Sequence, residues 1–200
     1  RSMSEKVIML GNEAIARGAY EAGVKVSAAY PGTPSTEISE NLVKYKDSLY
    51  CEWSPNEKVA TEVAIGASVS GVRAMSCMKH VGFNVAADPT YTVSYMGVNG
   101  GLVIVVADDP GLYSSQNEQD TRMVARAAQL PVIEPSDSAE AKEFIKIAFD
   151  LSEQFDRPFV YRTTTRLAHS QGLVELSERK EIEDKPYEKN IRKNVMMPGN

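Results

Sequence analysis

The sequence predicts a doubly wound α/β fold, in which a mostly parallel sheet carries helices on both faces. Short apolar segments alternate with segments of helical periodicity along most of the 200 residues, which is typical of strands joined by helical crossovers. The segment GLVIVVAD (101–108) is continuously apolar and rich in β-branched residues, as expected for a strand covered on both faces. Right-handed crossovers would then distribute the helices over the two sides of the sheet.

The expected strands are short apolar runs that end at prolines, glycines or polar clusters. In chain order they are VKVSAAYP (24–31), LYCEW (49–53), VRAMSCM (72–78), GLVIVVAD (101–108), PVIEP (131–135) and PFVYRTTT (158–165).

The expected helices place apolar residues at intervals of three and four. In chain order they span residues 12–23, 34–46, 55–71, 83–97, 117–130 and 138–155. Pro34 would occupy the first turn of the second helix, where proline is favoured. Pro89 should bend or break the fourth helix, because proline lacks a backbone N–H.

Composition and charge exclude several classes of protein. Hydrophobic residues make up 42% and charged residues 24% of the chain, the composition of an ordinary globular protein. A net charge of −5 argues against nucleic acid or an anionic membrane as a partner. No apolar run approaches the roughly 20 residues of a membrane span and no signal-peptide pattern is present, so we expect a cytoplasmic protein that does not bind a membrane.

Domain organisation follows from where the α/β pattern starts and stops. Arg1 and Ser2 resemble a cloning remnant, so residues 1–3 are taken as remnant and start, and residues 4–178 as the α/β domain. Residues 179–200 are charged and lack apolar periodicity, which indicates a linker or tail toward domains outside this chain.

In an open parallel sheet, ligands bind beyond the carboxyl ends of the strands. The segments expected there carry clustered Gly, Pro, Thr and Asn, and are YPGTPSTE (30–37), SPNE (54–57), MKHVGFN (78–84), DDPGLYSSQNEQD (108–120) and RTTTRLAH (162–169). The chain has no P-loop, no GxGxxG after the first strand and no GxSxG elbow. Neither histidine has a partner at metal-ligand spacing, so no metal site is expected on this chain.

Three segments resemble the N-terminal domain of 2-oxoacid:ferredoxin oxidoreductases: YPGTPSTEI, SPNEKVATEVAIGASVSGVRAMSCMKHVGFNVAADP and ADDPGLYSSQNEQDTR. The similarity runs from about Glu5 to Arg179 and is nearest to the indolepyruvate branch, whose members use thiamine diphosphate. It implies the pyrimidine-binding domain of an enzyme that decarboxylates an aryl pyruvate to an acyl-CoA and reduces ferredoxin. A pyruvate or 2-oxoglutarate oxidoreductase, a thiamine decarboxylase, and a non-catalytic α/β binding module remain alternatives.

The resemblance also implies site residues, each with a structural alternative. Glu57 matches the glutamate that meets N1′ of the thiamine pyrimidine, although Ser54 to Glu57 also reads as an S-x-x-E capping box. Gly32 and Thr33 would contact the cofactor, and Thr33 also the substrate, although Thr33 could simply be a helix N-cap. Lys79 and His80 are the candidates for the substrate carboxylate, although such a pair is more often ordinary surface.

Other side chains at this edge have weaker indications. Asp108 and Asp109 could bind a ligand or solvate a loop, and Ser115 with Glu118 suggests a second capping box. Arg162, Arg166 and His169 could bind the substrate carboxylate or pair with acids. An indole pocket could contain Tyr30, Trp53 and Phe83, although core packing is the stronger expectation for aromatic residues.

The chain lacks parts that such an enzyme needs. It has no GDG segment for Mg²⁺ and diphosphate, and its two cysteines, Cys51 and Cys77, cannot ligate an iron–sulfur cluster. The resemblance therefore implies half of a thiamine diphosphate site, with Mg²⁺ and iron–sulfur clusters bound elsewhere. The expected partners are a diphosphate-binding domain or second subunit, a further copy of the chain in a homo-oligomer, and ferredoxin, CoA and 2-oxoacid for the complete enzyme.

Overall fold

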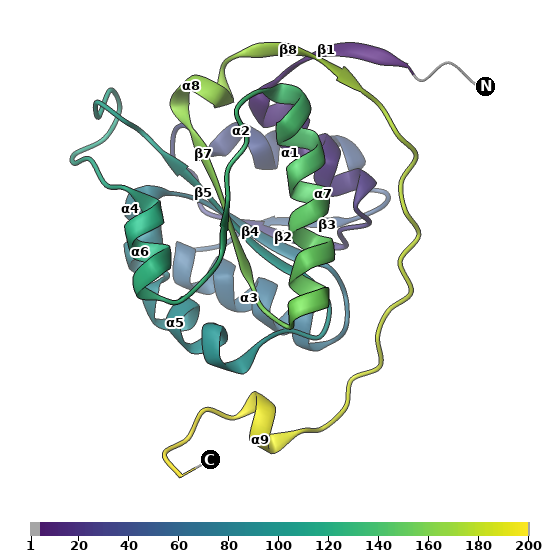
Figure 1. The fold of residues 1–200 in the computed structure, drawn as a ribbon, viewed down its shortest axis with the longest axis vertical. Coiled ribbons are helices and arrows are strands. Elements are labelled where there is room, and N and C mark those ends of the chain that lie inside the picture. The colour runs from purple at the N-terminus through teal and green to yellow at the C-terminus, as the bar shows by residue number, and fades with distance from the viewer. Residues whose placement is uncertain (1–4, 200) are drawn as a thin grey trace.

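The computed structural model describes residues 5–199 and confirms the doubly wound α/β fold. Its main sheet has six strands in the order β3-β2-β4-β5-β7-β6, and every neighbouring pair is parallel (Figure 1). The strands are β2 (Val26–Ala29), β3 (Tyr50–Trp53), β4 (Ala74–Lys79), β5 (Leu102–Asp108), β6 (Val132–Ile133) and β7 (Phe159–Thr164). Residues 102–107 of the central strand β5 are all 0% exposed, as expected for a strand with helices on both sides.

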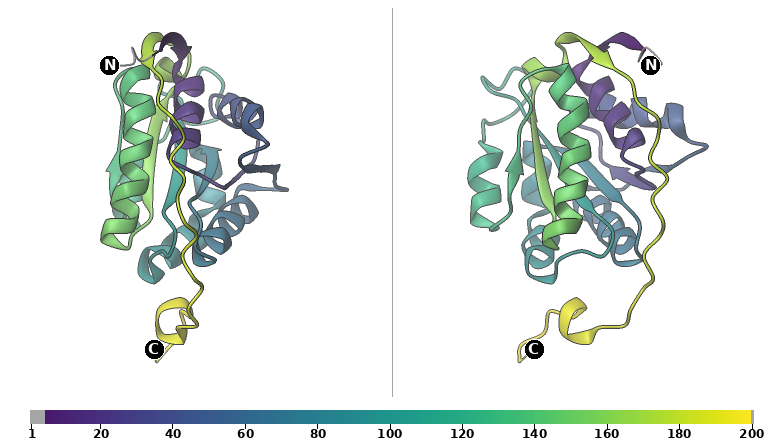
Figure 2. Two further views of the ribbon diagram at one scale, coloured as in Figure 1. Left: turned by 90° about the vertical axis from the view of Figure 1, so that its right-hand side faces the viewer. Right: turned by 45° about the vertical axis from the view of Figure 1, so that its right-hand side comes forward.

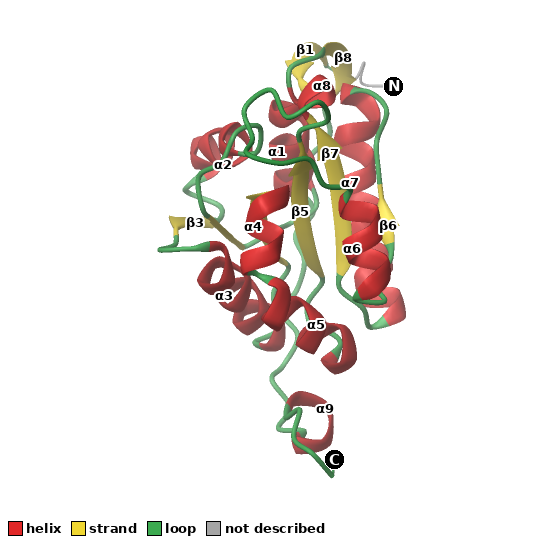
Figure 3. Cartoon of the chain, turned by 90° about the vertical axis from the view of Figure 1, so that its left-hand side faces the viewer, coloured by secondary structure: helices red, strands yellow, loops and turns green. Residues whose placement is uncertain are grey.

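The helices cover both faces of this sheet. One face carries α1 (Gly11–Glu21), α2 (Thr36–Leu42) and α7 (Ser138–Phe155), whose apolar side chains share one core cluster. The other face carries α3 (Glu57–Val69), α4 (His80–Val85), α5 (Ala87–Met96) and α6 (Thr121–Ala127), which Figure 3 shows nearest the viewer. Figure 2 shows α7 and α3 on opposite sides of the sheet. Three short helical segments complete the chain: a 3-10 turn (Val43–Tyr45), α8 (Thr165–Ala168) and α9 (Ile191–Asn194).

The predicted helix over 83–97 is two helices, and the break is not at Pro89. The chain turns at Ala86, between α4 and α5, and Pro89 is buried in the first turn of α5. A proline there loses no helical hydrogen bond, because the first N–H groups of a helix have no intrahelical partner. Pro34 also lies outside its predicted helix, since α2 begins at Thr36 after the N-cap Ser35.

A second, smaller sheet was not predicted. The strands β1 (Lys6–Leu10) and β8 (Gln171–Glu175) pair antiparallel at one end of the molecule, above α8 in Figure 1. The strands alternate only partly between exposed and buried positions, so their periodicity gives a weak signal.

Residues 176–194, here called the strap, follow β8 and lie along the body of the domain to α9 (Figure 1). The backbone N–H of Lys180 donates to the carbonyl of Glu21 at 2.9 Å, and that of Lys185 to Gly71 at 3.0 Å. Gly71 has φ +105°, and a Cβ there would lie 1.8 Å from the carbonyl oxygen of Lys185. The predicted linker is thus hydrogen-bonded to the domain where the structure describes it.

The expected cloning remnant at Arg1 and Ser2 lies outside the described residues. No helix among residues 5–199 has the length and apolar character needed to traverse a lipid bilayer.

Candidate functional site

The site lies where two neighbouring parallel strands send the chain to opposite faces of the sheet. The loop after β2 leads to α2 on one face, and β4 leads directly into α4 on the other. Sheets of this kind bind ligands at such a divergence, beyond the carboxyl ends of the strands, and this position between β2 and β4 is here called the crevice. Gly32, in the loop after β2, lies against the side chain of Lys79 at the end of β4, because a Cβ on Gly32 would be 3.0 Å from the Lys79 Cβ. The predicted segments 30–37 and 78–84 therefore meet at this point.

Glu57 is a buried carboxylate without a bonding partner. It is the first residue of α3 and only 9% exposed. Its side chain packs against the backbone of Gly82 in α4, where an added Cβ would lie 2.5 Å from Oε1 of Glu57. Among residues 5–199, no hydrogen bond or ion pair reaches the Glu57 carboxylate, which sets it apart from the other buried carboxylates of this region.

The capping alternative for Glu57 is wrong. The N-cap of α3 is Asn56, whose side-chain oxygen accepts the N–H of Val59 at 3.0 Å. The Ser54 hydroxyl instead donates to Glu52 at 2.7 Å. Glu57 is therefore at the first helical position, where a negative charge is favourable toward the helix dipole but no cap depends on it.

Lys79 is a buried cation without a carboxylate. It is 8% exposed, and its ammonium group donates to the carbonyl of Ser114 at 2.6 Å. The other buried lysine and arginine side chains in the described chain each have an acidic partner: Arg73 with Asp150 and Glu153, Lys142 with Glu21, and Arg162 with Asp108. Lys79 thus keeps its positive charge uncompensated at the crevice.

His80 is also buried and is held by the same loop. It is 1% exposed, and its Nε2 lies 3.0 Å from the carbonyl oxygen of Asn117. Because a carbonyl can only accept, this contact requires a proton on Nε2. Nδ1 is buried with no partner in the described chain. The alternative that Lys79 and His80 are ordinary surface residues is therefore wrong.

Asp109 fixes the loop, residues 109–120, that holds these two side chains. It is 1% exposed and accepts hydrogen bonds from the backbone of Ser114 at 2.8 Å, from the hydroxyl of Ser115 at 2.6 Å and from Thr165 at 2.8 Å. Burial alone would raise the pKa of Asp109, but these donors outweigh burial and lower its pKa to about 2. Asp109 is therefore a buried structural anion and not a solvating loop residue.

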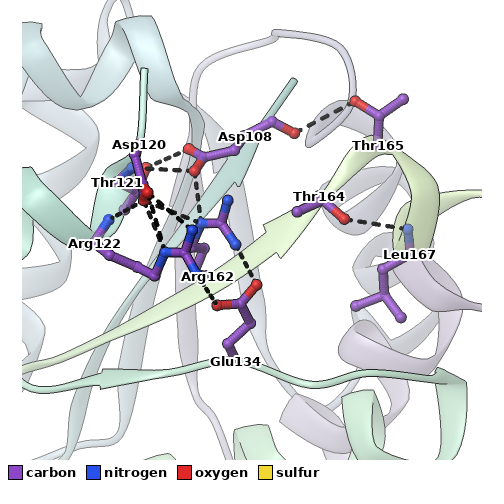
Figure 4. A network of polar contacts seen from close by, with 9 residues as sticks. All are labelled: Asp108, Asp120, Thr121, Arg122, Glu134, Arg162, Thr164, Thr165 and Leu167. Carbon is purple, nitrogen blue, oxygen red and sulfur yellow. Dashed lines mark hydrogen bonds and ion pairs between the residues drawn. The ribbon is translucent and has the colours of Figure 1, made fainter. Parts of the chain in front are cut away.

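Asp108 joins a second network next to that loop, which the Thr165 hydroxyl connects to Asp109 (Figure 4). Its carboxylate accepts from Arg162 at 2.6 Å and from the backbone and hydroxyl of Thr121, and Arg162 also pairs with Glu134. Arg162 is thereby paired with Asp108 and Glu134, so it is not available to bind a substrate carboxylate. Arg166 and His169 lie exposed on and after α8.

The second predicted capping box is wrong as well. Ser115 donates to Asp109, and the Glu118 carboxylate accepts the N–H of Gly111 at 3.0 Å. The N-cap of α6 is Asp120, whose side chain accepts the N–H of Arg122.

The structural alternatives for Thr33, Tyr30 and Trp53 are wrong, whereas the one for Phe83 is confirmed. Thr33 is exposed, and the N-cap of α2 is Ser35, so the N-cap alternative for Thr33 is wrong. Tyr30 and Trp53 are 40% and 48% exposed at the ends of β2 and β3, whereas Phe83 is 1% exposed in the core. Core packing therefore holds for Phe83 alone.

The prediction from sequence missed Gly82. A glycine inside a helix is unfavourable, so its presence in HVGFNV was a signal of close approach by another group. The structure identifies that group as Glu57.

The described residues show no group of three or more His, Cys, Asp or Glu side chains that could hold a metal ion. The two cysteines are free. Burial raises the pKa of Cys51 to about 11 and that of Cys77 to about 12, so both thiols stay protonated near neutral pH.

Known proteins are similar to this chain in sequence and in fold. Residues 17–199 match the family model described as "Pyruvate flavodoxin/ferredoxin oxidoreductase, thiamine diP-bdg". The indolepyruvate oxidoreductase subunit IorA of Archaeoglobus fulgidus is 54% identical over 98% of this chain and 33% of its own length. The IorA subunit of Pyrococcus horikoshii is 53% identical over 98% of this chain and 31% of its own length.

A solved structure supports the fold. A 2-oxoglutarate:ferredoxin oxidoreductase from Magnetococcus marinus superposes with a TM-score of 0.79 at 18% identity, covering 90% of this chain and 33% of that one. The chain thus spans about a third of the length of the curated relatives it matches. On the strength of the family match, this chain belongs to the pyruvate flavodoxin/ferredoxin oxidoreductase family, in its thiamine diphosphate-binding domain.

Proposed function

We propose that the chain supplies the pyrimidine-binding half of the thiamine diphosphate site of an indolepyruvate ferredoxin oxidoreductase. The complete enzyme would convert an aryl 2-oxoacid and CoA to an acyl-CoA and carbon dioxide, and pass the electrons to ferredoxin. The observation that carries the proposal is Glu57, a buried carboxylate with no partner in the described chain, at the crevice of the sheet.

The residues present fit the pyrimidine end of this cofactor. A buried carboxylate that lacks a hydrogen bond calls for a donor or a shared proton from a ligand. Gly82 brings backbone against Glu57, and a side chain at position 82 would displace the carboxylate. Gly32 likewise lets the loop after β2 approach the crevice closely.

The chemistry that thiamine diphosphate supplies when bound is a nucleophilic carbon for the oxoacid carbonyl, switched on by proton exchange at its pyrimidine ring. In this chain Glu57 would hold or release the proton at N1′ of that ring, with its side chain packed against the backbone of Gly82. Gly32 and Thr33 would contact the cofactor, with Thr33 also near the substrate.

Lys79 would bind the carboxylate of the oxoacid. It is a buried cation without an acidic partner in the described chain, and a substrate carboxylate would supply the missing negative charge. His80 would line the same position, with its Nε2 held by the carbonyl of Asn117.

The indolepyruvate assignment is favoured over a 2-oxoglutarate enzyme by sequence identity. IorA subunits reach 48% to 57% identity, whereas the 2-oxoglutarate synthase subunit KorA of Methanothermobacter thermautotrophicus reaches 29%. We propose that Mg²⁺, the diphosphate and the iron–sulfur clusters are held by other domains or a second subunit. Residues 179–200 would lead toward them.

The substitution Glu57→Gln in the complete oxidoreductase tests the proposal. Gln keeps the shape but cannot exchange a proton, so 2-oxoacid-dependent reduction of ferredoxin should fall by roughly 100-fold or more. Glu62→Gln is the matched control, because Glu62 lies exposed on the same helix. A Glu57→Gln enzyme with a near-normal rate would rule out the assigned role.

A further inference from the structure

A hydrogen-bonded chain of residues links Lys79 to Asp109 through Ser114. The ammonium group of Lys79 donates to the Ser114 carbonyl at 2.6 Å, and the N–H of the same Ser114 donates to the Asp109 carboxylate at 2.8 Å. Ser114 belongs to the loop between β5 and α6. The only cation left uncompensated at the crevice, among the buried side chains described, is thus one loop residue away from a buried anion.

The loop itself offers little to keep Ser114 in place. Leu112 is 47% and Tyr113 is 87% exposed, so the apolar residues of the loop do not pack into a core. Gly111 and Leu112 both have positive φ, a conformation that external contacts must maintain for a non-glycine residue. Asp109 provides such contacts, since it accepts from Ser114 and also from the hydroxyl of Thr165, at the start of α8.

The arrangement fixes the direction of the Lys79 ammonium group without pairing it with an acid. An ammonium group has three donors, so one hydrogen bond to a carbonyl leaves two for another acceptor. A carboxylate in direct contact would cancel the positive charge, whereas the neutral Ser114 carbonyl does not. The loop residue therefore orients Lys79, and Asp109 orients the loop residue.

We propose that Asp109 is a positioning residue: by fixing Ser114 it fixes the ammonium group of Lys79 in the crevice, ready for the carboxylate of the substrate. The proposal rests on the proposed function, in which Lys79 binds the oxoacid carboxylate. Lys79 would contact that carboxylate both before and during the reaction, so loss of its orientation weakens substrate binding more than it slows turnover.

The test uses Asp109→Ala in the complete oxidoreductase, which removes the acceptor of the Ser114 N–H, with Asp109→Leu as a second variant that removes the same acceptor and fills the space of the carboxylate. The KM for the aryl 2-oxoacid should rise about tenfold, with kcat and the KM values for CoA and ferredoxin little changed. Asp47→Ala is the matched control, because Asp47 is exposed and lies outside the crevice. If Asp109→Ala does not fold, Asp109→Leu decides the question.

A second readout does not depend on activity. Labelling of Lys79 by an amine-reactive ester, followed by mass spectrometry, should be faster in both variants than in the control, since the ammonium group is released from Ser114. Unchanged labelling and unchanged KM in folded variants would overturn the proposal, as would a lower kcat and lower thermal stability at unchanged KM. If Glu57→Gln retained activity, the proposed function would fail, while the labelling result would still report whether Asp109 holds Lys79.

Discussion

Two buried charges, Glu57 and Lys79, lack an oppositely charged partner in the described chain. Lys79 is the N-cap of α4, and Glu57 packs against Gly82 in the first turn of that helix. Removing a charge from water without a partner costs free energy, so residues of this kind are unusual in a structural core. Functional sites are where such groups concentrate, because a ligand completes their interactions. At the scale of the residue, these two side chains are therefore what distinguishes the site from the rest of the sheet edge.

This reasoning predicts the stability of Glu57 variants. Glu57→Gln and Glu57→Ala break no hydrogen bond in the described chain. The burial cost that they remove offsets the lost interaction of the charge with the dipole of α3, so the purified subunit should unfold at nearly the same temperature. Asn56→Ala provides the comparison, because it removes the N-cap bond to Val59 and should cost about 1 kcal/mol. Thermal or denaturant unfolding measures both. A loss in Glu57→Gln as large as that in Asn56→Ala would show a structural role for the glutamate.

At the scale of elements, the strap is attached to α1 by more than chain connectivity. The guanidinium group of Arg179 donates to the carbonyls of Tyr20 at 2.7 Å and Val24 at 3.0 Å, and lies 5.3 Å from the centre of the Tyr20 ring. These carbonyls lie at and beyond the end of α1, where helical carbonyls lack intrahelical partners. One arginine therefore caps a helix and holds the strap against it.

Arg179→Ala should release the middle of the strap. The amides of Lys180 and Lys185, which donate to Glu21 and Gly71, should exchange with deuterium faster, and the subunit should lose roughly 1–3 kcal/mol of stability. Arg192→Ala is the matched control, since Arg192 is an exposed arginine of α9. Hydrogen exchange followed by mass spectrometry makes the measurement. Equal protection of both amides in the two variants would contradict the expected role of Arg179.

The sequence was most informative where local patterns decide the structure. The predicted helix 138–155 coincides with α7, because a strong apolar stripe follows the N-cap Asp137. β1 and β8 were missed because each strand depends on a partner about 165 residues away, which leaves no local pattern.

In the candidate site, too, local sequence indicated some residues, whereas contacts with distant residues could not be predicted. Glu57 was selected from the sequence, but the cap at Asn56 was not, because S-x-x-E matches a capping box by spacing alone. The partners of Lys79 and His80 are backbone carbonyls of a distant loop. A carbonyl is present at every residue, so no side-chain type could reveal these contacts.

At the scale of the whole molecule, the described chain brings little positive charge to the crevice and is acidic overall. It contributes a carboxylate and one free cation to the crevice, and its net charge is −5. A diphosphate is itself strongly anionic, so its binding calls for Mg²⁺ or basic groups. The exposed aromatic rings of Tyr30 and Trp53 at the same edge are consistent with a surface that another domain or subunit covers.

The isolated chain should therefore bind thiamine diphosphate weakly or not at all. Calorimetric titration with thiamine diphosphate and Mg²⁺ makes the measurement, and the Glu57→Gln chain controls for heat unrelated to the site. Micromolar binding that the substitution abolishes would show that this chain holds a complete site.

The lack of charged partners at Glu57 and Lys79 also affects how this protein would respond to directed evolution. Libraries sorted for heat resistance alone would accept neutral residues at Glu57 and Lys79, because the sheet and its helices do not depend on them for a salt bridge within the described chain. Clones collected in this way would keep the fold and, under the proposed function, lose turnover. Selection for robustness and selection for turnover thus act in opposite directions at these two positions, and only the second preserves what makes this sheet edge a site.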